Sequence, residues 1–133
     1  MTQRNIEAMD IIVTKMAEGM TLSKALEKVY TKRVVQIPYK EEYFDELITD
    51  FGMSRRSTNA LLRGRMRKIS DVIKHCNEKK ITDIAGLGVG SGIEVMETIL
   101  DHCWNNMSQD EKTNFLINTV ERNSKYIRAE IEL

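Results

Sequence analysis

A cluster of glycines marks a stretch of this sequence where backbone amides could bind a ligand directly. Four of the seven glycines in the 133-residue chain lie within the seven residues GLGVGSG, at positions 86 to 92. A glycine-rich turn before a helix exposes backbone amides that bind phosphate, and glycine also adopts backbone angles with φ above zero. The cluster therefore predicts either a phosphate-binding turn or a tight turn that only joins two helices.

Two familiar nucleotide-binding motifs do not fit these glycines. The dinucleotide fingerprint GxGxxG fails because its third glycine position is occupied by Ser91 or Ile93, depending on where the motif starts. A P-loop needs a lysine directly after its last glycine, and the next lysine here is Lys112. What remains is a short helix, a Gly-x-Gly turn and a second helix, which resembles a helix-hairpin-helix. Its apolar positions are Ile81, Ile84 and Leu87 before the turn and Val95, Met96 and Ile99 after it.

A basic segment comes directly before the glycines. Residues 53–80 contain nine basic and two acidic residues, a net charge of 9 − 2 = +7, and the other 105 residues carry 11 − 18 = −7. A solvated helix face is the alternative explanation for such a run of charge. Because this run leads into the glycine cluster, we favour an anionic partner for the middle of the chain.

Two His-Cys pairs, His75-Cys76 and His102-Cys103, contain side chains that zinc sites use. Neighbouring residues on a helix point about 100° apart, so an adjacent pair is poorly placed to hold one metal ion. We expect the cysteines to pack as small apolar residues, and we expect no metal or other cofactor. The sequence shows no set of nucleophile, base and orienting residue, which favours a protein that is not an enzyme.

Helical spacing of apolar residues predicts the elements that would position these groups. In the first segment the spacing is 3, 4, 3 and 4, which predicts an amphipathic helix that Gly19 ends. We expect this stripe to face the core, with a coiled-coil seam as the alternative. Thr21 or Ser23 would begin a second helix. The stripe consists of Ile6, Met9, Val13, Met16 and Met20.

The middle of the chain alternates extended and helical patterns. RVVQIPY, residues 33–39, is β-branched and ends near the single proline, so it predicts an extended segment or short strand. Further helices are predicted between residues 43 and 51, ending at Gly52, from Ser54 to Gly64, and from about 69 to 76. The apolar positions of the first of these are Tyr43, Phe44, Leu47, Ile48 and Phe51.

Two longer helices are predicted after the glycines. Ser91 would cap the first, and Ser108 with Glu111 forms the capping box of the second. The apolar positions of the last helix are Leu116, Val120, Ile127 and Ile131. The sequence therefore predicts an all-α fold of six or seven short helices.

A longer stretch has a resemblance to a known family. The residues FGMSRRSTNALLRGRMRKISDVIKHCNEKKITDIAGLGVGSGIEVMETIL, 51–100, are similar to the C-terminal domain of the bacterial RNA polymerase α subunit. The similarity covers about residues 47 to 105. It implies a helix-hairpin-helix domain at residues 47–133 that includes an extra C-terminal helix, and an N-terminal helical segment, residues 1–46, packed on its core. The shared residues are Arg56, Ser57, Asn59, Leu61, Ile69, Asp71, the Gly-Leu-Gly turn, Ser91 and Glu94.

The resemblance implies roles for individual residues. Domains of this family bind the minor groove of A·T-rich promoter DNA and touch activators and the sigma factor. By position, Arg56 would enter the minor groove with polar support from Asn59. The turn would donate to phosphates from Gly88, Gly90 and Ser91, and Glu94 would lie beside the DNA surface.

The chain departs from the family directly after the hairpin, where Val89 and Gly90 replace lysines. This departure predicts weaker phosphate binding at the turn. Four nearby basic residues are candidates to compensate for the lost charge. They are Arg63, Arg65, Arg67 and Lys68.

We expect a bacterial, non-enzymatic, DNA-binding protein associated with transcription. The alternative is a protein-interaction module that docks to RNA polymerase, a sigma factor or an activator without binding DNA, which the missing lysines and the acidic remainder favour. A third interpretation takes TLSKALEKVY, residues 21–30, as the start of a helix-turn-helix, although the following TKRVVQIP suits an extended segment better.

The sequence also bears on the compartment. No apolar stretch approaches the roughly 18 residues of a membrane span, and acids interrupt the first 25 residues, unlike a secretory signal. We expect a cytoplasmic protein with reduced cysteines and no membrane partner. The oligomeric state is left open.

Overall fold

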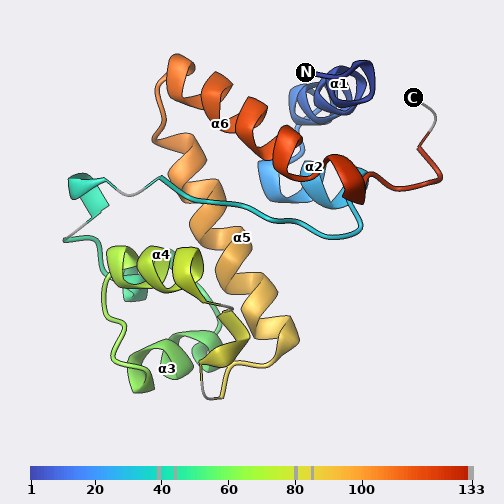
Figure 1. The fold of residues 1–133 in the computed structure, drawn as a ribbon. Helices are drawn as coiled ribbons and strands as arrows, with labels where there is room; N and C mark the ends of the chain where they lie inside the picture. The colour runs from blue at the N-terminus through green and yellow to red at the C-terminus, as the bar shows by residue number, and fades with distance from the viewer. Residues whose placement is uncertain (39, 44, 80, 85, 132–133) are drawn as a thin grey trace. The chain divides into compact units, whose positions relative to one another are not determined.

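The chain folds as an all-α protein, as predicted. The computed structural model describes residues 1–38, 40–43, 45–79, 81–84 and 86–131. In these ranges there are six α-helices, four short 3-10 helices and two isolated β-bridges, with no β-strand (Figure 1). No helix of the described residues is long and apolar enough to cross a membrane.

The chain forms two compact units. The first contains residues 1–35 and 104–133, and the second contains residues 36–103. These limits differ from the predicted boundary near residue 46. The residues from 36 to 46 group with the second unit, and the final helix groups with the first unit because it packs on the first helix.

The first unit is built from α1 (Gln3–Ala17), α2 (Leu22–Val29) and α6 (Gln109–Arg122), and α1 packs against both of the others. Of the two predicted candidates, Thr21 and Ser23, it is Thr21 that caps α2, by accepting from the amide of Lys24. The predicted capping box of Ser108 and Glu111 begins α6.

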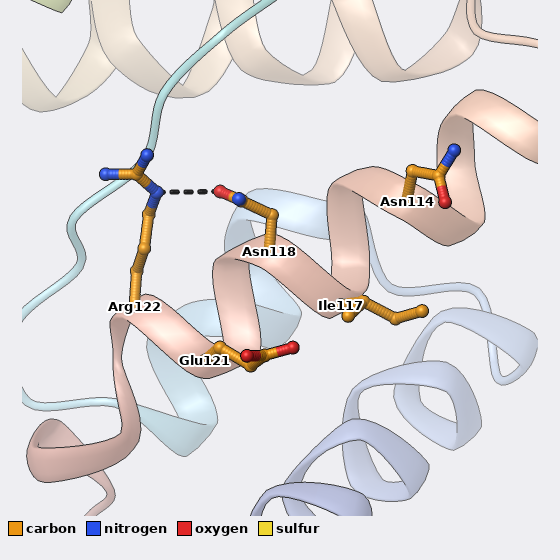
Figure 2. A pocket seen from close by; sticks show the side chains of 5 residues that line it. All are labelled: Asn114, Ile117, Asn118, Glu121 and Arg122. Atoms are coloured by element: carbon orange, nitrogen blue, oxygen red, sulfur yellow. Dashed lines mark hydrogen bonds between the residues drawn. The ribbon is translucent and has the colours of Figure 1, made fainter. Parts of the chain in front are cut away.

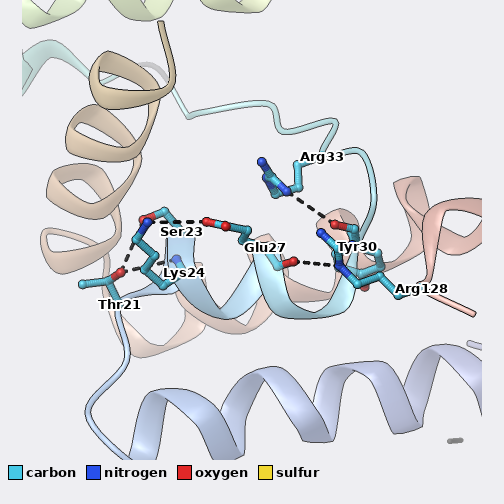
Figure 3. A network of polar contacts seen from close by, with 7 residues as sticks. All are labelled: Thr21, Ser23, Lys24, Glu27, Tyr30, Arg33 and Arg128. Carbon is cyan, nitrogen blue, oxygen red and sulfur yellow. Dashed lines mark hydrogen bonds and ion pairs between the residues drawn. The ribbon is translucent and has the colours of Figure 1, made fainter. Parts of the chain in front are cut away.

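The C-terminal end of α2 is held by two arginines that donate to backbone carbonyls (Figure 3). Arg128 Nε donates to the carbonyl of Glu27 at 3.0 Å, and Arg33 donates to that of Tyr30 at 3.4 Å. Tyr30 also forms an antiparallel bridge with Ile127. The contacts of Arg128 and Ile127 join the segment after α6 to the end of α2.

The final helix is shorter than the apolar spacing predicted. It ends at Arg122, so Ile127 and Ile131 lie beyond it. The buried amide of Asn123 explains the stop. Its Nδ2 donates to the carbonyls of Thr119 and Val34, and its Oδ1 accepts from the amide of Val34 at 2.8 Å. The side chain thus pairs with the extended segment instead of letting the helix continue.

The apolar stripe predicted to line the core from α1 is only partly buried, because Met9, Met16 and Met20 are half-buried and the other two residues are exposed. Ile6 and Val13 are 39% and 47% exposed, whereas Asn5, Ala8 and Ile12 are buried. Asn5 Nδ2 donates to Ser124 Oγ at 2.8 Å, which fixes this side of the helix inward. The prediction was wrong for Ile6 and Val13, because a small alanine and one hydrogen-bonded amide allow close packing that hydrophobicity alone does not indicate.

The second unit contains η1 (Glu41–Tyr43), η2 (Ile48–Phe51), α3 (Arg55–Arg63), α4 (Ile69–Glu78), η3 (Ile81–Asp83) and α5 (Val89–Asn105) up to Cys103. Its core is apolar and drawn from every one of these elements except η3. The largest buried residues include Tyr43, Ile48, Leu61, Ile69, Ile73 and Ile99.

The predicted helix between residues 43 and 51 is two separate 3-10 turns. Backbone bonds to the α3–α4 loop interrupt it: the amide of Ile48 donates to Arg67, and the amide of Ile69 donates to Glu46. Gly52, with φ of 66°, ends the second turn as predicted.

Residues 33–38 lie in no helix and no strand, which agrees with the predicted extended segment and not with its alternative, a short strand. Within the second unit, Asn77 holds this segment through Ile37, whose amide and carbonyl both bond to the Asn77 side chain at 3.1 and 2.9 Å. Tyr39, Phe44 and Lys80, which also entered the sequence predictions, lie outside the described residues.

Candidate nucleic-acid interface

Helix α3 carries the basic face of the candidate site. Ser54 begins the helix by accepting from the amide of Ser57 at 3.2 Å, and Gly64 ends it, both as predicted. Its inward side consists of Ser57, Ala60 and Leu61. The exposed residues are Arg55, Arg56, Asn59, Leu62 and Arg63.

Three of the exposed residues form one edge of α3. Asn59 and Arg63 follow Arg56 by three and seven positions, a spacing that puts side chains on the same side of a helix. The structure therefore brings two arginines and an amide side chain, all accessible to solvent, into one row.

Glu94 of α5 hydrogen-bonds Ser54, the residue directly before α3. Its Oε1 accepts from the Ser54 amide at 3.2 Å and from the Ser54 hydroxyl at 2.8 Å. Hydrogen bonds from the hydroxyls of Ser57 and Ser54 lower the pKa of this carboxyl below its ordinary value. Glu94 was predicted to lie beside bound DNA, but its bonds give it a positioning role within the protein. The sequence predicted Ser54 as the cap of α3, but it gave no sign that Ser54 would also hydrogen-bond Glu94.

The glycine turn packs against the other end of α3. Gly86 has φ of 85°, and a Cβ there would lie 2.7 Å from Arg63 Nη2. A Cβ on Gly64 would lie 3.3 Å from Ile84 Cγ2. The Arg63 guanidinium thus lies on the turn, while Glu94 holds the opposite end of the helix. The whole length of α3 is fixed against the segment that runs from η3 into α5.

Helix α5 begins earlier than predicted. The amide of Gly92 donates to the Gly88 carbonyl at 2.8 Å, which closes the first turn, so Gly88 is the residue before the helix. Ser91 therefore lies inside the first turn and is not the cap. As at any helix start, the first amides point outward without intrahelical acceptors and carry the positive end of the helix dipole.

Gly88 and Gly90 are exposed, and the fold itself does not require glycine at either position. A Cβ on either one would meet nothing within 4 Å. Neither has the positive φ that Gly86 adopts. Val89, between them, projects into solvent.

The four basic residues predicted to compensate for the missing lysines lie in two different places. Arg63 lies at the glycine turn. Arg65, with φ of 64°, and Arg67 and Lys68 lie in the α3–α4 loop, whose backbone bonds to residues 46–48. Lys68 Nζ is also 3.8 Å from Asp45, which offsets part of its charge.

The His-Cys pairs take part in packing. His102 hydrogen-bonds Glu46 and meets Phe51 edge-on, with ring centroids 4.6 Å apart. Burial raises the pKa of the Cys76 thiol to about 12 and that of the Cys103 thiol to about 11. Among the described residues, no group of three or more His, Cys, Asp and Glu side chains is arranged to hold a metal ion.

A shallow pocket lies on the outer side of α6 in the first unit (Figure 2). Arg122 Nε donates to Asn118 Oδ1 at 2.7 Å across it. The other lining residues are Asn114, Ile117 and Glu121. None of the residues predicted to bind DNA lines this pocket.

Comparison with known proteins adds no relative: no protein-family model, curated protein or solved structure matches the chain. The functional argument therefore depends on the residues and geometry of α3 and the glycine turn.

Proposed function

We propose that this protein binds duplex DNA through α3 and the start of α5. In this proposal, the segment from η3 to α5 works as a helix-hairpin-helix like that of the RNA polymerase α C-terminal domain, in a transcription-associated role. The observation that carries the proposal is the row of Arg56, Asn59 and Arg63 beside the glycine turn. Contacts at both ends of α3 hold this row in place.

The row suits a narrow groove with high negative potential. The minor groove of A·T-rich DNA is narrow, and an arginine inserted there responds to its width more than to individual bases. Arg56 is the residue we assign to that groove, with Asn59 making polar contacts next to it. Arg63, anchored on Gly86, supplies charge to the backbone phosphates.

The start of α5 is the second contact. Its outward amides near Gly88, Gly90 and Ser91 suit a phosphate oxygen, because a helix N-terminus favours anions. Glu94 contributes indirectly, by holding this turn against the first residues of α3.

Fluorescence anisotropy tests the proposal on the full chain. The wild type is titrated with A-tract and G·C-rich duplexes over a series of salt concentrations. We expect tighter binding to the A-tract and a log-log salt slope of about −2 to −5, as for a few neutralised phosphates. Arg56→Ala should weaken binding by about 1–3 kcal/mol.

The matched control is Arg4→Ala, which removes one exposed arginine from α1 in the first unit. It should leave the affinity nearly unchanged. Absence of duplex binding even at low salt, or equal losses in the two variants, would contradict the proposal.

One observation favours a second candidate, a protein-interaction module. The second unit has ten basic and eleven acidic residues, a net charge of 10 − 11 = −1. Its positive charge is therefore confined to one face and does not extend over the whole unit. If a tagged chain recovered RNA polymerase subunits equally well after nuclease treatment, while duplex binding was absent, this candidate would replace DNA binding.

A further inference from the structure

We propose that the exposed apolar pair Val89 and Ile93 packs on the deoxyribose of the bound strand and makes the protein prefer DNA over RNA. This inference rests on the proposed DNA-binding function and deepens it. It assigns a specificity role to two side chains that neither the arginine row nor the amides of α5 explain.

The two side chains are unusually exposed to solvent for aliphatic residues. Val89 is 72% exposed, the highest value among the large apolar residues that the structure describes, and Ile93 is 45% exposed. Their spacing of four places both on one side of the first turns of α5. Together they form an apolar surface in solvent at the position where the glycine turn meets the helix.

The glycines on either side of Val89 leave the backbone beside it without side chains. Alanine is a better helix former than glycine, and neither Gly88 nor Gly90 has a neighbour that would exclude a methyl group. Because packing within the protein does not require glycine here, we attribute these two glycines to a ligand that approaches the backbone closely. A flat backbone with one projecting apolar side chain fits close contact with a ligand.

The neighbouring positive charges suit the DNA strand of the proposed function. The Arg63 guanidinium lies on Gly86, two residues before Gly88, and Arg56 is on the same edge of α3. A strand whose phosphates contact these arginines passes the start of α5. Between successive phosphates such a strand presents its sugars, and these are the apolar surface available to Val89 and Ile93.

The sugar differs between the two nucleic acids. The wide minor groove of A-form RNA displays 2′-hydroxyl groups, whereas deoxyribose presents C–H groups at that position. Apolar side chains that cover a hydroxyl remove its water and offer no hydrogen bond in return. The pair should therefore favour deoxyribose.

The test measures the full chain against a DNA duplex and an RNA duplex of the same A·T-rich sequence, with U for T. The wild type should bind DNA more tightly. The variant Val89→Ser/Ile93→Ser should lose about three- to tenfold of its DNA affinity, from the apolar contact that it removes. Its RNA affinity should change by less than about twofold. Val13→Ser is the matched control, an exposed valine of α1, and should change neither affinity.

The narrow groove assigned to Arg56 already favours DNA over A-form RNA, so only the selective loss in the double variant supports the sugar contact. Equal affinity of the wild type for DNA and RNA, or equal losses for both in the double variant, overturns the sugar contact but leaves DNA binding intact. Full DNA affinity in a double variant that melts like the wild type also overturns it, and would leave the apolar pair to a protein partner. Binding of neither duplex by the wild type overturns the proposed function together with this inference.

Discussion

The glycines of the turn at residues 86–92 have different structural roles, and substitutions at single positions can distinguish these roles. Gly86 needs its positive φ and lies against Arg63, whereas Gly88 and Gly90 have room for a side chain. We expect Gly86→Ala to destabilise the protein by about 1–2 kcal/mol, the cost of a left-handed residue. Gly90→Ala should stabilise it by up to about 1 kcal/mol. Chemical denaturation measures both changes, and equal destabilisation by the two variants would contradict this division.

The same variants are informative in DNA binding. Gly90→Ala is expected to fold better and bind more weakly, because the added methyl group lies where the strand approaches. A Gly90→Ala variant with unchanged DNA affinity would show that the ligand does not need this glycine.

Glu94 predicts a specific dependence of stability on pH. Hydroxyl hydrogen bonds lower its folded pKa, so its contribution to stability is fully present above the ordinary carboxyl value of 4.5. It is lost as pH falls through the lower, folded pKa. Denaturant titrations of the wild type and Glu94→Gln should therefore differ at neutral pH and converge as pH falls through the lowered, folded pKa of Glu94. A difference that is constant with pH would rule out this role of the carboxylate.

At the scale of the helix, α1 shows how a regular apolar pattern misidentifies the buried side. Ile12 is fully buried and Val13 is about half exposed, although the stripe placed Val13 on the inward side and left Ile12 out. Ile12→Ala should cost about 2–4 kcal/mol, as for other buried aliphatic side chains. Val13→Ala should cost less than about 0.5 kcal/mol. Thermal or chemical unfolding measures the pair, and comparable losses would contradict the observed orientation.

At the scale of the whole molecule, a net charge of zero conceals a local basic face. Arg63 lies beside the turn and Arg56 shares its edge of α3, while the loop basic residues Arg65, Arg67 and Lys68 are tied to the segment around residue 46. We expect Arg56→Ala/Arg63→Ala to reduce the log-log salt slope of DNA binding by about 2, since each lost phosphate contact contributes about 0.9. Replacing all three loop residues with alanine should change the slope less. A larger effect of the loop residues would move the interface toward the α3–α4 loop.

Local patterns determined much of this protein without the structure. The all-α class, the caps at Thr21, Ser54 and Ser108, the end at Gly52 and the extended segment followed from the sequence alone. These features depend on residues a few positions apart, so short-range hydrogen bonding and backbone preference are sufficient to specify them.

Tertiary structure decided the features that depend on contacts distant in sequence. Asn123 ends α6 through Val34, 89 residues away, and Glu94 bonds Ser54 across 40 residues. The buried side of α1 and the separation of Arg63 from the loop basic residues are likewise consequences of packing. Such contacts have no periodic signal in the sequence, because a hydrogen bond between remote residues requires only that the fold bring their atoms together.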